Sequence, residues 1–424
     1  MTRRVWNFIG EYSVLLVVGA FIALLWANIS PESYHHFVHW EIIHDSPIGH
    51  LHDDGKGHLV KSLTLHFLVN DLLMAFFFAI AGKEVWEAMA LKNGSLRGKN
   101  ALNPLIATAG GMVGPVAIYL LGAAALGKFA ALANGWAIPT ATDIAFSYLI
   151  GRIIFGAGHP AVGFLLLLAI VDDACGLIIL AVFYPRGDLA VEWLLLSLVA
   201  AIAVYLVFNL GPRMLDRGKS QMPNSTWVRK HLSFWPYLIA GAASWYAFHR
   251  AGIHPALGLL PIIPAIPHAD IDFGIFAGEE TARHDLLNDM EHNLKYPVEF
   301  ILLSFGLMNA GVEFSAVGAA TTLVLAGLLV GKPLGIWLFG VFAEKALNLG
   351  LPDGMKQSDL FLVGCIAAIG FTVSLFIATV AFPPGDIQDA AKMGALLSFG
   401  AAGMALVAAR IFKPNKVASN SKSD

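Results

Sequence analysis

Two adjacent carboxylates lie in the middle of an apolar stretch that is long enough to cross a lipid bilayer as a helix. The stretch runs from Leu165 to Phe183, LLLLAIVDDACGLIILAVF, and the carboxylates are Asp172 and Asp173. One charge at this depth costs about 3 kcal/mol on insertion scales, so such residues usually mark ion or proton pathways. Two carboxylates this close should titrate as a coupled pair. A proton and a small hard cation would then compete for the same oxygen atoms.

A lysine in another apolar stretch offers a counter-charge. Lys332 lies in LLVGKPLGIWLFG, about ten residues, or roughly 15 Å, from either end of its run. Snorkelling is the usual explanation for a lysine in a membrane helix, but this distance favours a partner among the aspartates. Successive helix residues point about 100° apart, so one aspartate can face Lys332 while the other faces a cavity. The alternative is an acid pair that only holds helices together.

The stretch Gly135 to Phe146, GWAIPTATDIAF, predicts a break in a membrane helix. Pro139 lacks an amide hydrogen and disfavours helical geometry in the residue before it. Thr140, Thr142 and Asp143 supply oxygen atoms to backbone groups that have lost their helical partners. Irregular backbone at this depth is tolerated only where protein or a water-filled cavity surrounds it.

A second, weaker candidate for a break is Gly364 to Ser374, GCIAAIGFTVS. It contains glycine and hydroxyl residues but no proline, and such residues alone more often indicate close helix packing. Its position favours a break. It lies in the second of three consecutive apolar runs, 317–343, 358–382 and 388–412, just as the first break lies in the second of the runs 102–126, 130–151 and 160–183. Two groups of three spans that begin on opposite sides of the membrane are typical of an inverted repeat. In such a repeat the site lies where the broken helices cross.

The composition identifies the class of protein that must position these residues. The chain has 424 residues, of which 57% are hydrophobic and 13% charged, and its mean hydropathy is +0.67. Soluble domains carry about 25% charged residues, so we expect an all-α polytopic membrane protein. Runs of about 17–25 apolar residues are candidate spans, and we count twelve: 11–29, 63–87, 102–126, 130–151, 160–183, 189–211, 232–250, 253–268, 296–313, 317–343, 358–382 and 388–412.

If the fourth and eleventh runs are broken and cross, four half-helix ends meet inside the membrane. The two N-terminal ends each carry roughly +0.5 charge and the two C-terminal ends the opposite charge. We therefore expect Asp143 to neutralise the positive ends and Lys332 the negative ends. This arrangement would surround the aspartate pair with carboxylate and carbonyl oxygen, the ligands that suit a small hard cation.

The distribution of basic residues predicts the orientation. With the N-terminus inside, 18 Lys and Arg residues fall in inner segments and 6 in outer segments, so both termini should be cytoplasmic. We expect residues 1–424 to form one membrane domain, with an outer histidine-rich loop at 30–62 and a disordered tail at 413–424. The stretch Ile48 to Leu59 of that loop predicts a small hairpin.

Several other features have ordinary explanations. His35 and His39 share a helix face and suggest a metal site, although a solvated loop is the simpler explanation. The loop from His268 to Lys295 is rich in carboxylates and histidines and is either a solvated face or responsive to pH. Lys83 and Glu87 are spaced to pair on one helix face. The net charge of −3 gives no indication of nucleic-acid binding, and no cofactor is expected.

The motifs together resemble a known family of transporters. GWAIPTATDIAF, AIVDDACGLIILAVFY, MNAGVEF, VGKPLGI and IGFTVSLFIATVAF match, in order, the NhaA-type sodium/proton antiporters. The resemblance implies that Asp173 is the main cation-binding carboxylate and that Asp172 exchanges its proton or its pairing with Lys332. It also implies that Thr142 and Asp143 lie at the helix crossing. Members of this family exchange Na⁺ or Li⁺ for a larger number of protons across the bacterial inner membrane, so the exchange is electrogenic. A homodimer is compatible with the sequence.

The same resemblance implies activation at alkaline pH, through Glu84, Glu291 and His292. Near these residues the chain departs from the usual family pattern at Trp86, Ala88 and Lys295, and the departures concern the pH set point rather than ion binding. An intramembrane aspartyl protease is an enzymatic alternative, but it needs its two acids on separate helices and usually a Gly-x-Gly-Asp turn. A carrier of K⁺ or of an organic anion is a third hypothesis. An anion carrier should have basic residues at the crossing, where acids outnumber Lys332.

Overall fold

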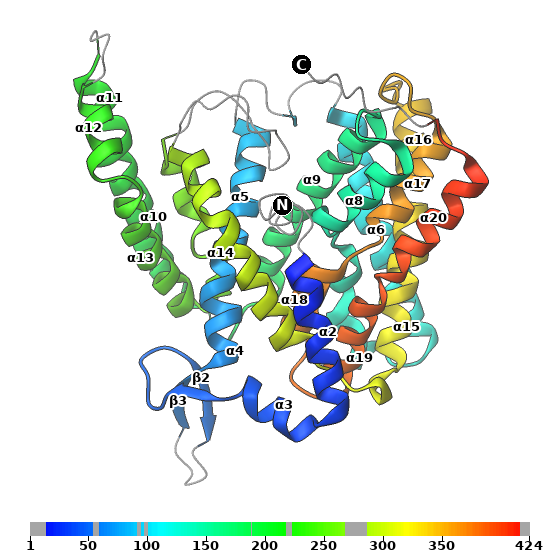
Figure 1. Cartoon of the computed structure of the whole chain (residues 1–424), viewed down its shortest axis with the longest axis horizontal. Helices are drawn as coiled ribbons and strands as arrows, with labels where there is room; N and C mark the ends of the chain where they lie inside the picture. The colour runs from blue at the N-terminus through cyan, green and yellow to red at the C-terminus, as the bar shows by residue number, and fades with distance from the viewer. Residues whose placement is uncertain are drawn as a thin grey trace, which may run out of the picture. The chain divides into compact units, whose positions relative to one another are not determined.

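The structure is a computed structural model. It describes residues 14–53, 59–90, 95–96, 101–187, 189–217, 223–267 and 286–415. These residues are predominantly helical, with three short strands (Figure 1). The chain forms two compact units. The first comprises Met1–Pro31, Ser95–Ile179 and Asn309–Asp424, and the second comprises Glu32–Gly94 and Leu180–Met308.

The first unit contains most of the helices that correspond to the two groups of three apolar runs. Its elements are α2 (Val14–Ile29), α6 (Leu102–Ala125), α7 (Phe129–Leu132), η3 (Ala133–Thr140), α8 (Ile144–Phe155), α9 (Pro160–Phe183), η8 (Phe314–Ala316), α15 (Ala319–Ala326), η9 (Gly327–Gly331), α16 (Lys332–Lys345), α17 (Gln357–Ala367), α18 (Phe371–Ala381), α19 (Asp386–Leu397) and α20 (Gly400–Phe412). The last residues of α9, from Leu180 on, fall in the second unit.

The second unit combines helices with a small sheet. Its elements are α3 (Pro31–Val38), β1 (Glu41–Ile43), β2 (His50–Asp53), β3 (Leu59–Thr64), α4 (Leu65–Phe67), η1 (Leu68–Leu73), α5 (Met74–Ala90), η4 (Val191–Trp193), α10 (Leu194–Val204), η5 (Tyr205–Leu210), α11 (Gly211–Leu215), α12 (Pro223–His231), α13 (Trp235–Ala251), η6 (Pro255–Leu257), η7 (Leu260–Ala265) and α14 (Leu286–Asn309). Within this unit, α10 packs along α13, both green in Figure 1.

The helices confirm a polytopic membrane protein. Six helical segments of the described chain are long and apolar enough to span a bilayer: Leu65–Ala90, Leu102–Ala125, Pro160–Phe183, Val191–Leu215, Ala319–Lys345 and Asp386–Phe412. Two bent pairs raise the number to eight if each pair is one span. Phe129–Thr140 meets Ile144–Phe155 at 53°, and Gln357–Ala367 meets Phe371–Ala381 at 50°. Both bends lie within the stretches that the sequence suggests as breaks, while the count of twelve spans stays a prediction.

The sheet occupies part of the histidine-rich loop. Strand β3 is central and pairs antiparallel with β2, where His50 lies opposite Ser62, and with β1. The rings of His35 and His39 lie 4.2 Å apart between centroids. Within the described part of the chain, no group of three or more His, Cys, Asp or Glu side chains is arranged to hold a metal ion.

Helix α16 approaches α6 through glycines rather than side chains. A Cβ atom added at Gly335 would overlap the carbonyl oxygen of Gly110, and one added at Gly114 would overlap the carbonyl oxygen of Gly331. Small residues of this kind allow two membrane helices to make backbone contact. The contact holds the start of α16, and therefore Lys332, against α6.

We expect Gly335→Ala to destabilise the protein by roughly 1–3 kcal/mol, because the added methyl group has no space between the two backbones. Gly176→Ala on α9 is the matched control, since a Cβ there meets no atom within 4 Å. Thermal unfolding of the two purified variants in detergent measures the difference. Equal stability of the two variants would contradict the assignment of a tight α6–α16 contact.

Candidate functional site

One carboxylate caps the N-terminal ends of two half-helices. After the 3₁₀ segment η3 the chain is extended at Ala141, and Asp143 is the N-cap of α8. One oxygen of Asp143, Oδ1, accepts a hydrogen bond from the amide of Phe146 at 3.3 Å. The other, Oδ2, accepts from the amide of Thr372 at 3.3 Å and from the Thr372 hydroxyl, at the start of α18. Because each helix start carries partial positive charge, Asp143 compensates both.

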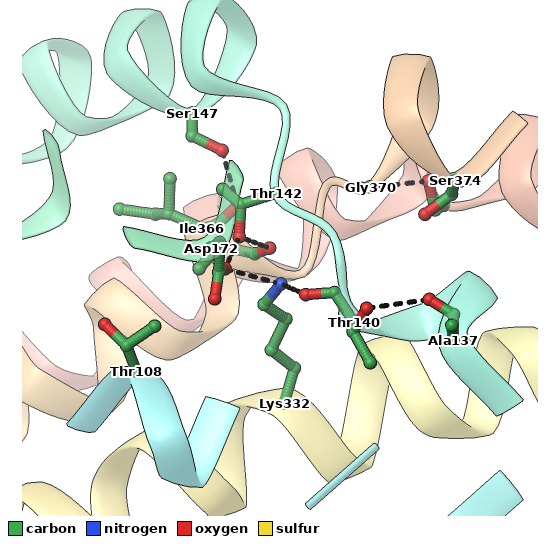
Figure 2. Close-up of polar contacts among 12 residues, drawn as sticks. Thr108, Ala137, Thr140, Thr142, Ser147, Asp172, Lys332, Ile366, Gly370 and Ser374 are labelled. Carbon is green, nitrogen blue, oxygen red and sulfur yellow. Dashed lines mark hydrogen bonds and ion pairs between the residues drawn. The ribbon is translucent and has the colours of Figure 1, made fainter. Parts of the chain in front are cut away.

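The C-terminal ends at the same breaks are satisfied by groups from other segments. The Nζ atom of Lys332 donates to the carbonyl oxygen of Thr140, the last residue of η3 (Figure 2). The amide of Asp143 donates to the carbonyl of Ile369 at 2.7 Å, just beyond α17. These contacts place Asp143 at the positive ends and Lys332 at a negative end, as the sequence predicts.

Lys332 also forms an ion pair with the first aspartate of the pair. Its Nζ atom lies 2.9 Å from Oδ2 of Asp172, and both side chains are completely buried. Two local features position the lysine. Residues Gly327–Gly331 form a widened π-helical turn, and Pro333 lacks the amide hydrogen that a regular helix would use. The prediction that one aspartate faces Lys332 is met by Asp172.

A hydroxyl joins this ion pair to the second break. The Oγ1 atom of Thr142 lies 2.6 Å from Oδ2 of Asp172 and 3.1 Å from the carbonyl oxygen of Ala367, at the end of α17 (Figure 2). Both acceptors are within hydrogen-bond range of the one hydroxyl hydrogen of Thr142. Thr142 therefore contacts α9 and α17 from the extended segment between η3 and α8.

The aspartate pair has carboxylate oxygens that the described residues leave unsatisfied. Oδ1 of Asp172 and Oδ1 of Asp173 are both buried, and neither has a hydrogen-bond partner in the described part of the chain. A buried acceptor without a partner costs roughly 1–3 kcal/mol, and more when it is charged. Such atoms need a proton or a cation, so the site has the donor set for either.

The residues that the resemblance links to pH regulation belong to the second unit. Lys83 is completely buried on α5 and lies 2.8 Å from Glu87 and 3.8 Å from Glu84. This is the pairing that the spacing of Lys83 and Glu87 predicts. His292 is exposed on α14. Glu291 is on the same helix, but its side chain is outside the part that the structure describes.

The structure places two further serines, Ser147 and Ser374, beside the breaks. The sequence does not distinguish Ser147 on α8, and it indicates Ser374 on α18 only as one of the small and hydroxyl residues of the second break. Both are buried, and each donates a hydrogen bond to a carbonyl of the other broken span. The signal in the sequence is a hydroxyl residue four positions after Asp143 and four positions after Gly370, each inside an otherwise apolar run.

Comparison with known proteins assigns these motifs to one family across the chain. The family described as Na⁺/H⁺ antiporter 1 matches residues 9–409. A Na⁺/H⁺ antiporter NhaA from Jannaschia sp. is 67% identical over 97% of this chain and 99% of its own length. Relatives of the same name from Desulfitobacterium hafniense and Geotalea uraniireducens are 44% and 43% identical. They cover 98% and 97% of this chain, and 98% and 97% of their own lengths.

Proposed function

Because the chain belongs to the Na⁺/H⁺ antiporter 1 family, we propose that it exchanges Na⁺ for H⁺ at the aspartate pair on α9. The family is one of transporters, and the helices are those of a multi-pass membrane protein. In this proposal Asp173 is the principal cation ligand. Asp172 shares its charge between Lys332 and the ion.

The observation that supports the proposal best is the pair of unpartnered buried oxygens beside a single buried lysine. Oδ1 of Asp172 and Oδ1 of Asp173 have no hydrogen-bond partner among the described residues, and Lys332 contacts only the Oδ2 side of Asp172. A small hard cation prefers oxygen ligands, and a proton binds the same atoms. Since the two ions exclude each other, release of one accompanies binding of the other, which is the requirement for antiport.

The break residues complete the proposed site. Thr142 joins the second break to α9, and Asp143 caps both half-helices, so we propose that they set the geometry in which the cation binds. We further propose that the two triplets of spans are inverted repeats of a twelve-helix fold, in which rocking exposes the site to each side in turn. Both termini would be cytoplasmic in the bacterial inner membrane.

The finer transport properties are also proposals. Li⁺ should replace Na⁺, because it is a small hard cation that accepts the same ligands. We propose an exchange of more protons than Na⁺ ions, which makes transport electrogenic, and activation at alkaline pH through Glu84, Glu291 and His292. The protein would act as a monomer or a homodimer. The differences at Trp86, Ala88 and Lys295 are expected to shift the pH set point.

Transport in everted membrane vesicles tests the function. Respiration acidifies the vesicle interior, and added Na⁺ or Li⁺ should then dissipate the pH gradient, as a fluorescent pH probe reports. Vesicles from the same cells without the protein are the control. A response to K⁺ alone, or no difference from the control vesicles, would overturn the proposal.

The same vesicles test activation at alkaline pH, and proteoliposomes test whether transport is electrogenic. Activity should rise from neutral to alkaline pH, so a flat profile would exclude inherited pH activation. In proteoliposomes, a membrane potential imposed without an ion gradient should drive Na⁺ transport if unequal charges are exchanged. No effect of the potential would show that the exchange is electroneutral.

A further inference from the structure

Two buried serines occupy equivalent positions in the two broken spans. Ser147 is four residues after Asp143, the N-cap of α8, and Ser374 is four residues after Gly370, the N-cap of α18. The amide of each serine donates to the carbonyl of its own N-cap residue at 3.0 Å, which is the first regular bond of each half-helix. Their exposed fractions are 1% and 0%. The hydroxyl groups are therefore not needed to start either helix.

Each hydroxyl bonds to the opposite span instead of to its own helix. The Oγ atom of Ser147 donates to the carbonyl oxygen of Ile366 at 3.2 Å, and the Oγ atom of Ser374 donates to that of Ile138 at 2.7 Å. A serine inside a helix ordinarily bonds back to the carbonyl four residues earlier. Here the two bonds run in opposite directions between the same two spans, and Figure 2 shows both serines beside the breaks.

The two acceptors lie at the ends of half-helices, where carbonyl groups lack the amide four residues on that a continuous helix would supply. The carbonyl of Ile366 also accepts from the amide of Ile369 at 3.2 Å. Ile366 is the last residue but one of α17 and precedes Ala367, whose carbonyl contacts Thr142. Ile138 precedes Pro139 and is two residues from Thr140, whose carbonyl accepts from Lys332. Ser147 therefore supports the segment that contacts Thr142, and Ser374 supports the segment that contacts Lys332.

We propose that Ser147 and Ser374 are paired positioning residues that hold the two breaks in register and thereby set the affinity for the transported cation. This inference rests on the proposed antiport function and deepens it. Neither serine is a ligand of the ion. Ser374 acts through a carbonyl two residues from Thr140, the acceptor of Lys332. Ser147 acts through a carbonyl one residue from Ala367, an acceptor of Thr142, which itself contacts Asp172. Loss of either bond therefore alters the geometry of the same site.

The test measures Na⁺-dependent antiport of Ser147→Ala, Ser374→Ala and the double variant as a function of Na⁺ concentration. Each single change should raise the KM for Na⁺ about three- to tenfold, the effect of one lost hydrogen bond, with the maximal rate per protein within about twofold. Because both bonds hold one arrangement, the double variant should raise the KM by less than the product of the single effects. Ser147→Thr and Ser374→Thr, which keep the hydroxyl, should restore a near-normal KM.

Ser304→Ala is the matched control. Its hydroxyl bonds back to the carbonyl of Phe300 within α14 at 2.9 Å, so its removal should leave the KM unchanged. If an alanine variant does not fold, Ser147→Cys and Ser374→Cys replace the hydroxyl by a thiol, a weaker donor, and should show the raised KM. The inference is overturned if the KM values stay normal, if KM effects multiply fully, or if only the maximal rate falls. Wild-type protein without Na⁺-dependent proton flux would instead overturn the proposed function.

Discussion

Replacing Asp173 by asparagine should abolish Na⁺- and Li⁺-dependent dissipation of the pH gradient in everted vesicles. Asparagine has nearly the same size and shape as aspartate, but it neither binds a proton in this pH range nor carries the negative charge that a cation needs. Because Oδ1 of Asp173 is buried and has no hydrogen-bond partner among the described residues, the amide removes a ligand at the place where the cation and the proton compete. Activity should fall to the level of vesicles without the protein.

The control for Asp173→Asn is Asp386→Asn. Asp386 is exposed in the first turn of α19, so its replacement makes the same chemical change outside the site and should leave transport unchanged. Both variants must be present in the membrane in equal amounts, as quantified by immunoblot. Normal Na⁺-dependent transport by Asp173→Asn would show that another group binds the ion.

Replacing Lys332 by methionine should strongly destabilise the protein. The change leaves Asp172 buried without its counter-charge and the carbonyl of Thr140 without its donor. Breaking a buried ion pair by removing one partner typically costs about 3–5 kcal/mol, because the remaining charge is uncompensated. Thermal unfolding of the purified protein in detergent measures the effect. Lys345→Met, at the exposed end of the same helix, should have a stability close to that of the unchanged protein.

A double variant separates charge from packing. Lys332→Met combined with Asp172→Asn removes both charges, and it should be more stable than Lys332→Met alone because no uncompensated charge remains. If the ion pair were unimportant, the two changes would add, and the double variant would be the less stable one. That result would contradict the assignment of Lys332 as the counter-charge of Asp172.

The sequence predicts the first break well because its cause is local. Pro139 removes an amide hydrogen, and Thr142 and Asp143 follow with oxygen atoms, so the chain itself carries the physical reason for the bend. The second break has no proline, so the sequence indicates it only through the position of its stretch in the middle of three consecutive apolar runs. Asp143 at the positive ends and Lys332 at a negative end followed from the charges of half-helix ends.

Other parts of the site depend on tertiary contacts that no local pattern contains. Spacing indicates that one of Asp172 and Asp173 faces Lys332. It does not say which, because the sequence alone does not show which side of the helix faces the lysine. The crossed serine bonds require the two spans to meet before either hydroxyl has its acceptor. The same is true in the second unit, where Asp71 lies in a π-helical turn and forms an ion pair with Arg186, 115 residues away.

The Thr142 hydroxyl has one hydrogen atom but two acceptors within reach, Asp172 on α9 and the carbonyl of Ala367 on α17. It can donate fully to only one of them at a time. An ionised Asp172 attracts that hydrogen more strongly than a neutral carbonyl does. A protonated Asp172 can instead donate its own hydrogen to Thr142, which releases the threonine hydrogen to Ala367. Protonation of Asp172 on α9 would therefore strengthen the hydrogen bond from Thr142 to the carbonyl of Ala367, at the end of α17.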